Sequence, residues 1–232
     1  MKTKYRLASI LAFGLAIGAS GQQSAPPPAK PADGTPTLAD TMQFIQEKLS
    51  EQGQIGWAQT QSNQPGFTKR ILVLVSDVMA DPAACTFYSA GTIETKIDLP
   101  KGRSLKPGGP VTEDDLHIHI VESGTVPLKQ EEKVTVEKLQ DVQNQGFAEA
   151  AHPDITATVT PPIFYVKLWA SSAVFSIHTS TTKGNQAPVE KDSTNKTSGA
   201  SFRDEDTANR VAKAMTHAVE LCGGGVPKKS LF

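Results

Sequence analysis

The feature that most constrains this chain is a series of short apolar runs in its central part. In residues 116–122 (LHIHIVE) apolar and polar side chains alternate over most of the run, which is typical of a strand that buries one face. Residues 69–79 (KRILVLVSDVM) form a longer run that is rich in β-branched side chains. Because turn residues such as Asp81-Pro82 separate these runs, the pattern predicts an antiparallel sheet.

We expect about seven to nine strands in this part of the chain. They are predicted at residues 55–60, 69–79, 85–93, 95–99, 116–122, 132–139, 155–160, 163–170 and 173–179. Only Ser171-Ser172 separates the last two runs, which predicts that they form a hairpin. Residues 144–154 indicate a loop or a short helix. Residues 181–201 are polar and carry almost no large apolar side chain, so we expect a long mobile excursion there.

Two amphipathic helices bracket the strands. In residues 37–52 apolar side chains recur every three or four positions, Thr37 can cap the first amides, and Gly53 suits a left-handed stop. Residues 204–222 begin with acidic side chains, which favour the positive end of the helix dipole, and continue with an unbroken apolar face. Both apolar faces must be buried, so both helices are expected to pack on the sheet.

These elements predict an α+β fold. We expect a bent antiparallel β-barrel or sandwich of about seven strands, with an N-terminal helix and a C-terminal capping helix. The chain shows no internal repeat, which predicts a single β-rich globular domain over residues 37–222. A proline-rich linker at residues 22–36 precedes it, and a flexible tail at residues 223–232 follows it.

Residues 1–21 have the pattern of a secretory signal peptide. Lys2, Lys4 and Arg6 precede an apolar stretch at residues 7–17, and small residues then offer a cleavage site. As a helix the apolar stretch would extend only about 16 Å, half of a bilayer core, which favours a signal peptide over a membrane anchor. We therefore expect a periplasmic or secreted protein with no integral membrane segment after cleavage.

The charge balance narrows the choice of partner. The chain has 23 Lys and Arg against 24 Asp and Glu, a net charge of −1, whereas a dedicated nucleic-acid binder normally has a basic face. We therefore expect no nucleic acid as a partner. The expected export suggests an unknown envelope protein or a small ligand.

Export would place Cys85 and Cys222 in an oxidising compartment. A disulfide between them would close a loop of 137 positions and stabilise the fold by up to about 4–5 kcal/mol. The alternative is two small buried thiols, since spacing along the chain does not give the Cα separation that a disulfide needs.

His117 and His119 are the candidate metal ligands. Side chains two positions apart on a strand share a face, so these two imidazoles could chelate one zinc or copper ion. Residues that could complete such a site are His178, His152, Glu122 and Asp115. The alternative is that both histidines are ordinary polar residues on a solvent-exposed strand face.

Patterns for catalysis are missing from the sequence. No serine lies in a G-x-S-x-G elbow, and the glycines at residues 223–225 follow a helix, whereas phosphate binding needs them before one. The aromatic residues between positions 163 and 175 could form a platform for a sugar or a lipid, or could belong to the core. We expect an exported non-enzymatic binding or interaction module of unknown ligand and without a cofactor. The alternative is a zinc-binding protein or metal-dependent enzyme that uses His117 and His119.

Residues 202–224 (FRDEDTANRVAKAMTHAVELCGG) resemble the closing helix of pleckstrin-homology-like domains. The order of elements from Thr68 to Cys222 is similar to that fold, in which a C-terminal helix caps a bent seven-stranded barrel. The segment TLADTMQFIQEKL, at residues 37–49, resembles the start of exported bacterial proteins of unknown function. Lys69-Arg70 stands alone where some pleckstrin-homology domains have a basic phosphoinositide-binding cluster. The resemblance therefore implies a fold and no function.

Overall fold

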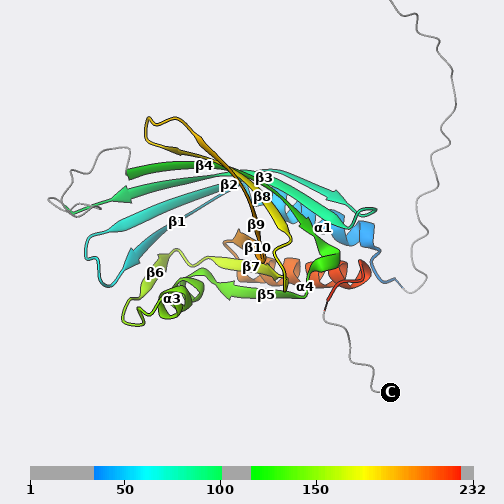
Figure 1. Ribbon diagram of the computed structural model, residues 1–232. Helices are drawn as coiled ribbons and strands as arrows, with labels where there is room; N and C mark the ends of the chain where they lie inside the picture. Colours follow the sequence, from blue (N-terminus) through cyan, green and yellow to red (C-terminus); the bar gives the residue numbers. More distant parts are fainter. Residues whose placement is uncertain (1–33, 101–115, 226–232) are drawn as a thin grey trace, which may run out of the picture.

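The computed structural model describes residues 34–100 and 116–225, which form two antiparallel sheets and three α-helices (Figure 1). The large sheet has seven strands in the order β6-β1-β2-β3-β4-β8-β9. The small sheet has three strands in the order β10-β7-β5. The predicted signal peptide, most of the predicted linker and the end of the predicted tail lie outside the described residues.

The strands are β1 (Gln54–Gln61), β2 (Thr68–Asp81), β3 (Thr86–Asp98), β4 (His117–Pro127), β5 (Lys133–Lys138), β6 (Ala157–Thr160), β7 (Phe164–Trp169), β8 (Phe175–Lys183), β9 (Val189–Asn195) and β10 (Thr197–Phe202). The helices are α1 (Leu38–Glu51), α3 (Leu139–Glu149) and α4 (Glu205–Leu221), with a short 3-10 helix η1 (Leu128–Gln130).

The α+β class and the antiparallel pairing confirm the sequence prediction, but of the two arrangements predicted, barrel or sandwich, the described strands do not form a closed barrel. In the described chain β6 and β9 are the two edges of the large sheet and do not pair with each other. The strands β5, β7 and β10 form a sheet of their own, so they are not available to close the large sheet into a barrel.

The predicted hairpin between the runs at 163–170 and 173–179 is also wrong. These runs form β7 and β8, which belong to different sheets. A two-residue hairpin favours residues that accept a positive φ, such as Asn-Gly. Ser171-Ser172 contains neither Asn nor Gly. The connection instead lies along the β9–β10 turn, where the Ala170 amide donates to the Lys196 carbonyl at 2.9 Å.

The polar segment at residues 181–201 is ordered as the end of β8, β9 and most of β10, which corrects the predicted mobile excursion. β9 pairs with β8, and β10 pairs with β7. Edge strands obtain their stability from backbone hydrogen bonds to one neighbour, so their side chains can remain polar and exposed. Low hydrophobicity therefore did not indicate a missing element in this segment.

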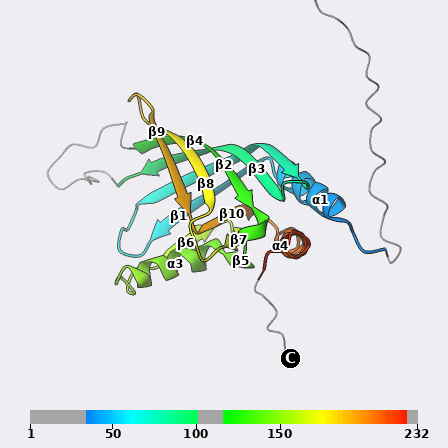
Figure 2. The same ribbon diagram turned by 45° about the vertical axis from the view of Figure 1, so that its right-hand side comes forward.

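Both terminal helices confirm the predictions. At the start of α1, the Thr37 hydroxyl accepts from the Asp40 amide at 3.1 Å, and the Asp40 carboxylate accepts from the Thr37 amide, which completes a capping box. At the start of α4, the Asp204 carboxylate accepts from the Thr207 amide at 2.7 Å. The two helices lie together at one end of the large sheet in both views (Figures 1 and 2).

The main core is built where α1 and α4 meet the two sheets. It contains buried side chains from both helices, from one end of the long strands and from β7, including Ile45, Val78, Phe87, Val166, Phe175, Phe202, Val211 and Met215. A second and smaller cluster of Ile55, Val159 and Ile163 lies at the β1–β6 edge, with Trp57 and Leu139 packed against it.

Cys85 and Cys222 form a disulfide, with their Cα atoms 5.9 Å apart. Cys85 lies in the turn between β2 and β3 with a φ of 56°, and Cys222 follows the last turn of α4. The bond therefore fastens the final helix to the end of the β2–β3 hairpin, and the open alternative of two buried thiols is excluded.

A crease crosses the long strands of the large sheet. The β2–β3 register shifts between Val75 and Asp77, and Gly91 lies opposite Val75. A side chain at Gly91 would collide with the Leu74 carbonyl, and one at Gly124 on β4 would approach the Ser176 carbonyl at 2.9 Å. Backbones can approach this closely only at glycine, and the bulge adds local bending.

The crease divides β2, β3 and β4 into two parts. In the covered half, beyond the crease toward α1 and α4, inner-face side chains such as Val78 and Phe87 are buried in the main core. The overhanging half extends away from the helices, and Figure 1 shows it arching above α3 and β6. We call the face that Val78 and Phe87 share the inner face of the sheet, and the opposite one the outer face.

Candidate binding site

His117 and His119 lie on the outer face of β4 and flank Glu94 of β3. The His117 Nε2 lies 3.6 Å from one Glu94 oxygen, and the His119 Nδ1 lies 3.4 Å from the other. Because each imidazole contacts a different carboxylate oxygen, the three side chains form a row of ion pairs when the histidines are protonated. The predicted shared face is confirmed, since the register places both histidines opposite the β3 side that carries Glu94 and Lys96.

The residues proposed to complete a metal site lie elsewhere. His178 is opposite Ser123, four positions along β4 from His119, which is about 13 Å. His152 follows α3, Glu122 projects from the inner face, and Asp115 lies outside the described residues. In the described parts of the chain, no three or more His, Cys, Asp or Glu side chains are arranged to hold a metal ion.

His178 lies between two carboxylates of β9. Its Nδ1 is 2.7 Å from Asp192 and its Nε2 is 3.1 Å from Glu190. The hydrogen bond to Asp192, above the other influences, raises the pKa of the imidazole. Both ring nitrogens thus face carboxylates, so neither can take a proton from a nearby serine as a Ser-His-Asp triad requires.

A shallow trough of about 500 Å³ crosses the outer face beside His178. Its residues come from β3, β4, β8 and β9 and carry many hydroxyl groups, among them Tyr88, Ser123, Thr125, Ser176 and Thr194. Most of these side chains are exposed, so the trough resembles an ordinary hydrated strand surface.

The inner face of the overhanging half carries an apolar surface that belongs to neither core cluster. Strand alternation places six half-buried side chains on this face, and none of them packs against the main core or the smaller cluster. They are Val73, Ile93, Ile97, Ile118, Ile120 and Ile177. Five of the six lie in the overhanging half, where Ile71 and the opposite Thr95 on the same face are buried, 7% and 5% exposed.

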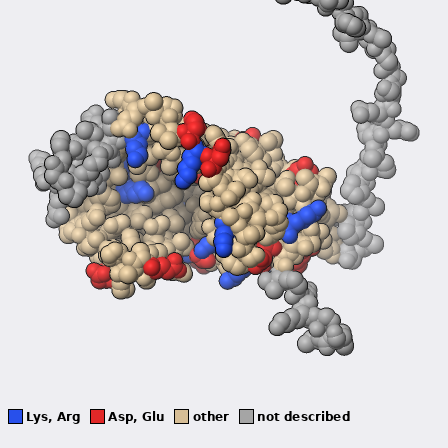
Figure 3. All heavy atoms as spheres, in the orientation of Figure 1, with Lys and Arg blue, Asp and Glu red and all other residues tan. Residues whose placement is uncertain are grey.

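Figure 3 shows a hollow beneath the overhanging half, on the face seen in Figure 1, with Lys and Arg side chains at its edge. We call this hollow, with its roof of apolar side chains, the groove. The neighbouring strands of the sheet cover only the edges of these side chains, so the groove is an apolar surface that solvent still reaches. A contiguous exposed apolar surface of this kind often marks a binding site.

The inner end of the groove lies at the crease and is polar. Glu122 projects from β4 directly opposite Gly91, which has no side chain to cover it. Burial raises the pKa of the Glu122 carboxyl above its ordinary value. The described residues give this carboxylate no hydrogen bond or ion pair, so a half-buried acid marks the boundary between core and groove.

Tyr165 faces this acid from the small sheet. Burial, followed by the charges of Glu122 and Glu137, raises the pKa of Tyr165 to about 12. A side chain at Gly199 would meet the Tyr165 hydroxyl at 2.8 Å, so glycine on β10 leaves room for the ring. Glu137 lies 3.8 Å from Lys167, so one of the two acids near Tyr165 has a cation and Glu122 does not.

The helix α3 forms the lower edge of the groove and is fastened by its polar side chains. The Gln140 and Asn144 side chains accept from the Val159 and Ala157 amides of the edge strand β6, at 3.3 and 2.7 Å. The Gln59 side chain donates to Gln143 at 3.4 Å and links β1 to the same helix. These bonds cover the free edge of β6 and hold α3 in place although none of its residues is buried.

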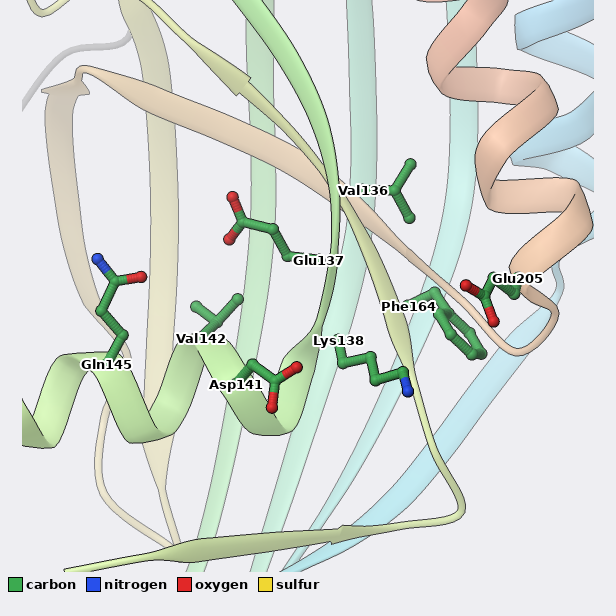
Figure 4. A pocket seen from close by; sticks show the side chains of 8 residues that line it. All are labelled: Val136, Glu137, Lys138, Asp141, Val142, Gln145, Phe164 and Glu205. Atoms are coloured by element: carbon green, nitrogen blue, oxygen red, sulfur yellow. The ribbon is translucent and has the colours of Figure 1, made fainter.

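A second hollow of about 370 Å³ lies between β5 and the start of α3, with Phe164 and Glu205 also in its lining. Figure 4 shows Glu137 projecting from β5 toward Val142 and Gln145 of α3. Lys138 projects to the other side, toward Glu205. Neighbouring residues of β5 therefore line this hollow from opposite faces of the strand.

Sequence reasoning missed Glu122 as part of this site, although a signal was present. The alternation that places Leu116, Ile118 and Ile120 on one face continues to Glu122, so the pattern puts a carboxylate on a face that is otherwise apolar. The aromatic residues of the proposed platform have different environments. Phe175 is buried in the core, Tyr165 faces the groove, and Trp169 is exposed.

Among the described helices, none combines the length and the hydrophobicity that crossing a bilayer requires. Comparison with protein families, with curated proteins and with solved structures gives no match for this chain. The function is therefore inferred from the geometry of the site.

Proposed function

We propose that this protein is an exported, non-enzymatic binding protein that holds a small apolar ligand in the groove. The observation that carries the proposal is the group of half-buried valine and isoleucine side chains on the inner face that pack on neither core cluster. Removing such a surface from water contributes about 25 cal/mol for each Å² covered, which a ligand of modest size can exploit. The disulfide supports export, because such bonds persist in oxidising compartments.

The absence of a convergent reactive set supports binding over catalysis. In the described chain the histidine nearest to several hydroxyl groups is His178, and its two nitrogens both face carboxylates. Glu122 and Tyr165 line the groove, and in the described parts of the chain Glu122 belongs to no group of three or more His, Cys, Asp or Glu residues that could hold a metal ion. We retain a pleckstrin-homology-like fold as part of the proposal, supported by the bent antiparallel sheet and the C-terminal helix.

The test compares two neighbouring residues of β4 that face opposite ways. Ile120→Thr removes apolar surface from the groove, while Val121→Thr changes the outer face, where Val121 is 45% exposed. Threonine keeps the β-branched shape that strands favour, so both variants should fold. Binding is measured with an uncharged fluorescent apolar dye, N-phenyl-1-naphthylamine.

We expect saturable dye binding by the natural protein, binding weakened roughly fivefold by Ile120→Thr, and little change with Val121→Thr. Thermal unfolding of each variant checks that the fold is intact. Equal losses in both variants, or no saturable binding by the natural protein, would contradict the proposal.

Metal binding through His117 and His119 is the second candidate. The observation in its favour is that a carboxylate, Glu94, lies within 3.6 Å of both imidazoles. Calorimetric titration with Zn²⁺ tests it: micromolar binding that disappears in His117→Ala would support a metal site, and no heat would end the idea.

A further inference from the structure

We propose that the ligand of the groove is a free long-chain carboxylate, held with its hydrocarbon chain under the overhanging half and its charged group at the outer mouth. This inference rests on the proposed function and adds the chemical class of the ligand and its direction. It follows from how charge is distributed along the inner face.

The outer mouth of the groove is basic. Lys69 of β2 lies opposite Ile97, and Lys183 of β8 lies opposite Ile118, so both lysines project from the inner face beside its last apolar residues. In the described chain neither lysine has a hydrogen bond or an ion pair through its ammonium group. Among the described residues of β3 at this end, the acids Glu94 and Asp98 alternate onto the outer face, where Asp98 pairs with Arg70 at 2.7 Å.

The inner end of the groove has no excess of positive charge. Glu122 and Glu137 both act on Tyr165, and Lys167 is paired with Glu137. Thr179 of β8 lies opposite Glu122, and Lys191 of β9 lies opposite Thr179, so Lys191 is a second cation near this end. An anionic group placed here would lose its hydration and face carboxylates, whereas at the mouth it would remain hydrated and face two lysines. The two ends therefore favour one direction for an anionic amphiphile.

The distance between the ends suits a long chain. Lys69 and Val75 are six positions apart on β2, which is about 20 Å along the strand. The surface between them is roofed by the valine and isoleucine side chains of β2, β3 and β4. A neutral apolar ligand would use the roof but not the lysines, and an alkylammonium ion would be repelled at the mouth. A carboxylate uses both.

The experiment measures displacement of the fluorescent dye by dodecanoate, dodecanol and dodecylammonium, each below its micellar concentration. These probes share one chain and differ in the charge of the head group. We expect the natural protein to bind dodecanoate roughly tenfold more tightly than dodecanol, and dodecylammonium more weakly still.

The variant Lys69→Gln/Lys183→Gln should lose most of the preference for dodecanoate and keep its affinity for dodecanol. The matched control Lys96→Gln/Lys129→Gln removes the same charge from the outer face of β3 and from η1, and should keep the preference. Anionic phospholipid vesicles should not displace the dye, because the groove binds a single free chain and its carboxylate at the same time.

The outcomes separate this inference from the proposed function. Equal affinity for the three probes, or a preference that survives Lys69→Gln/Lys183→Gln, overturns the carboxylate inference and leaves apolar binding in the groove standing. Displacement by vesicles assigns the surface to membranes and likewise overturns it. If the natural protein binds neither the dye nor any probe, the proposed function itself fails.

Discussion

The two halves of the long strands carry similar residues on the same inner face and yet have different environments. In the covered half, Val78 and Phe87 are buried against α1 and α4, and the disulfide fastens the last helix beside them. In the overhanging half, Val73 and Ile93 lie on the same strands and the same face but remain half exposed. The two halves differ because they meet at the crease at Gly91 and because α1 and α4 pack below the covered half alone.

This contrast shows that an apolar strand face does not by itself identify a core. The inner face is apolar on both sides of the crease, and the helices α1 and α4 cover only one of these sides. The remaining part is stable as an exposed surface because its neighbours in the sheet are fixed by the covered half. The predictions below ask whether stability and binding are divided between the halves in this way.

The largest effect is expected from breaking the disulfide. Cys85→Ser/Cys222→Ser should lower the free energy of unfolding by about 2–5 kcal/mol, because the unfolded chain is then no longer constrained by a closed loop of 137 residues. Urea unfolding with and without a reductant measures this. The natural protein should respond to the reductant and the double variant should not; a natural protein indifferent to reduction would contradict the assignment.

The next effect compares how strongly burial raises the pKa of two acids. Glu131, in the covered half after η1, is 1% exposed, and burial raises its pKa to about 8. The unfolded chain loses this proton near the ordinary value of 4.5, so stability is fully present below that pH and falls as the pH rises to about 8, by a few kcal/mol in total.

Glu131→Gln should flatten this slope when urea unfolding is measured between pH 5 and 8.5. Glu122→Gln is the comparison in the groove, where burial raises the pKa of a half-exposed carboxyl, and it should flatten the slope less. A larger change with Glu122→Gln would mean that the groove, and not the covered half, contains the more strongly desolvated acid.

A matched pair on β2 tests the comparison directly. Val78→Ala should cost about 2 kcal/mol, because it leaves a cavity in the main core. Val73→Ala, on the same strand and face, should cost less than about 1 kcal/mol and should weaken ligand binding instead. Chemical unfolding and dye titration of both variants give the two values; equal stability losses would show that the overhanging half is core.

The smallest effect concerns the outer face. On this face the hydrogen bond between His178 and Asp192 raises the pKa of the imidazole. The contribution of His178 to stability is therefore present below its ordinary pKa of 6.5 and is lost as the pH rises through the raised pKa. Nuclear magnetic resonance titration should place the midpoint of His178 above that of an ordinary histidine. Asp192→Asn should return the midpoint toward the ordinary value, and no movement would exclude the pairing.

The helices could be predicted because their signals are local. Thr37 with Asp40, and Asp204 with the acids that follow it, determine helix starts from neighbouring residues alone. The strands of the large sheet were also visible in the alternation. The Cys85–Cys222 bond was one of two possibilities, since only the fold brings the two ends of that long segment together.

The groove could not be predicted because it depends on partners that are distant in the sequence. Alternation shows that Ile93 and Ile120 share a face, but not that α1 and α4 stop short of them. The failed hairpin prediction has the same origin: β7 pairs with β5 and β10 and β8 pairs with β4 and β9, so the two strands join different sheets. Low hydrophobicity misled in β9 and β10 because edge strands need few apolar side chains.

The packing of α1 against α4 has a consequence for how the protein folds. The first and last helices of the described chain share one core, so the core cannot close until the whole chain is available. Contacts between such distant segments slow folding, because the intervening loop must be ordered first. A chain delivered gradually, from its N-terminus onward, would remain unfinished until α4 arrives, and in that interval it could associate with chaperones.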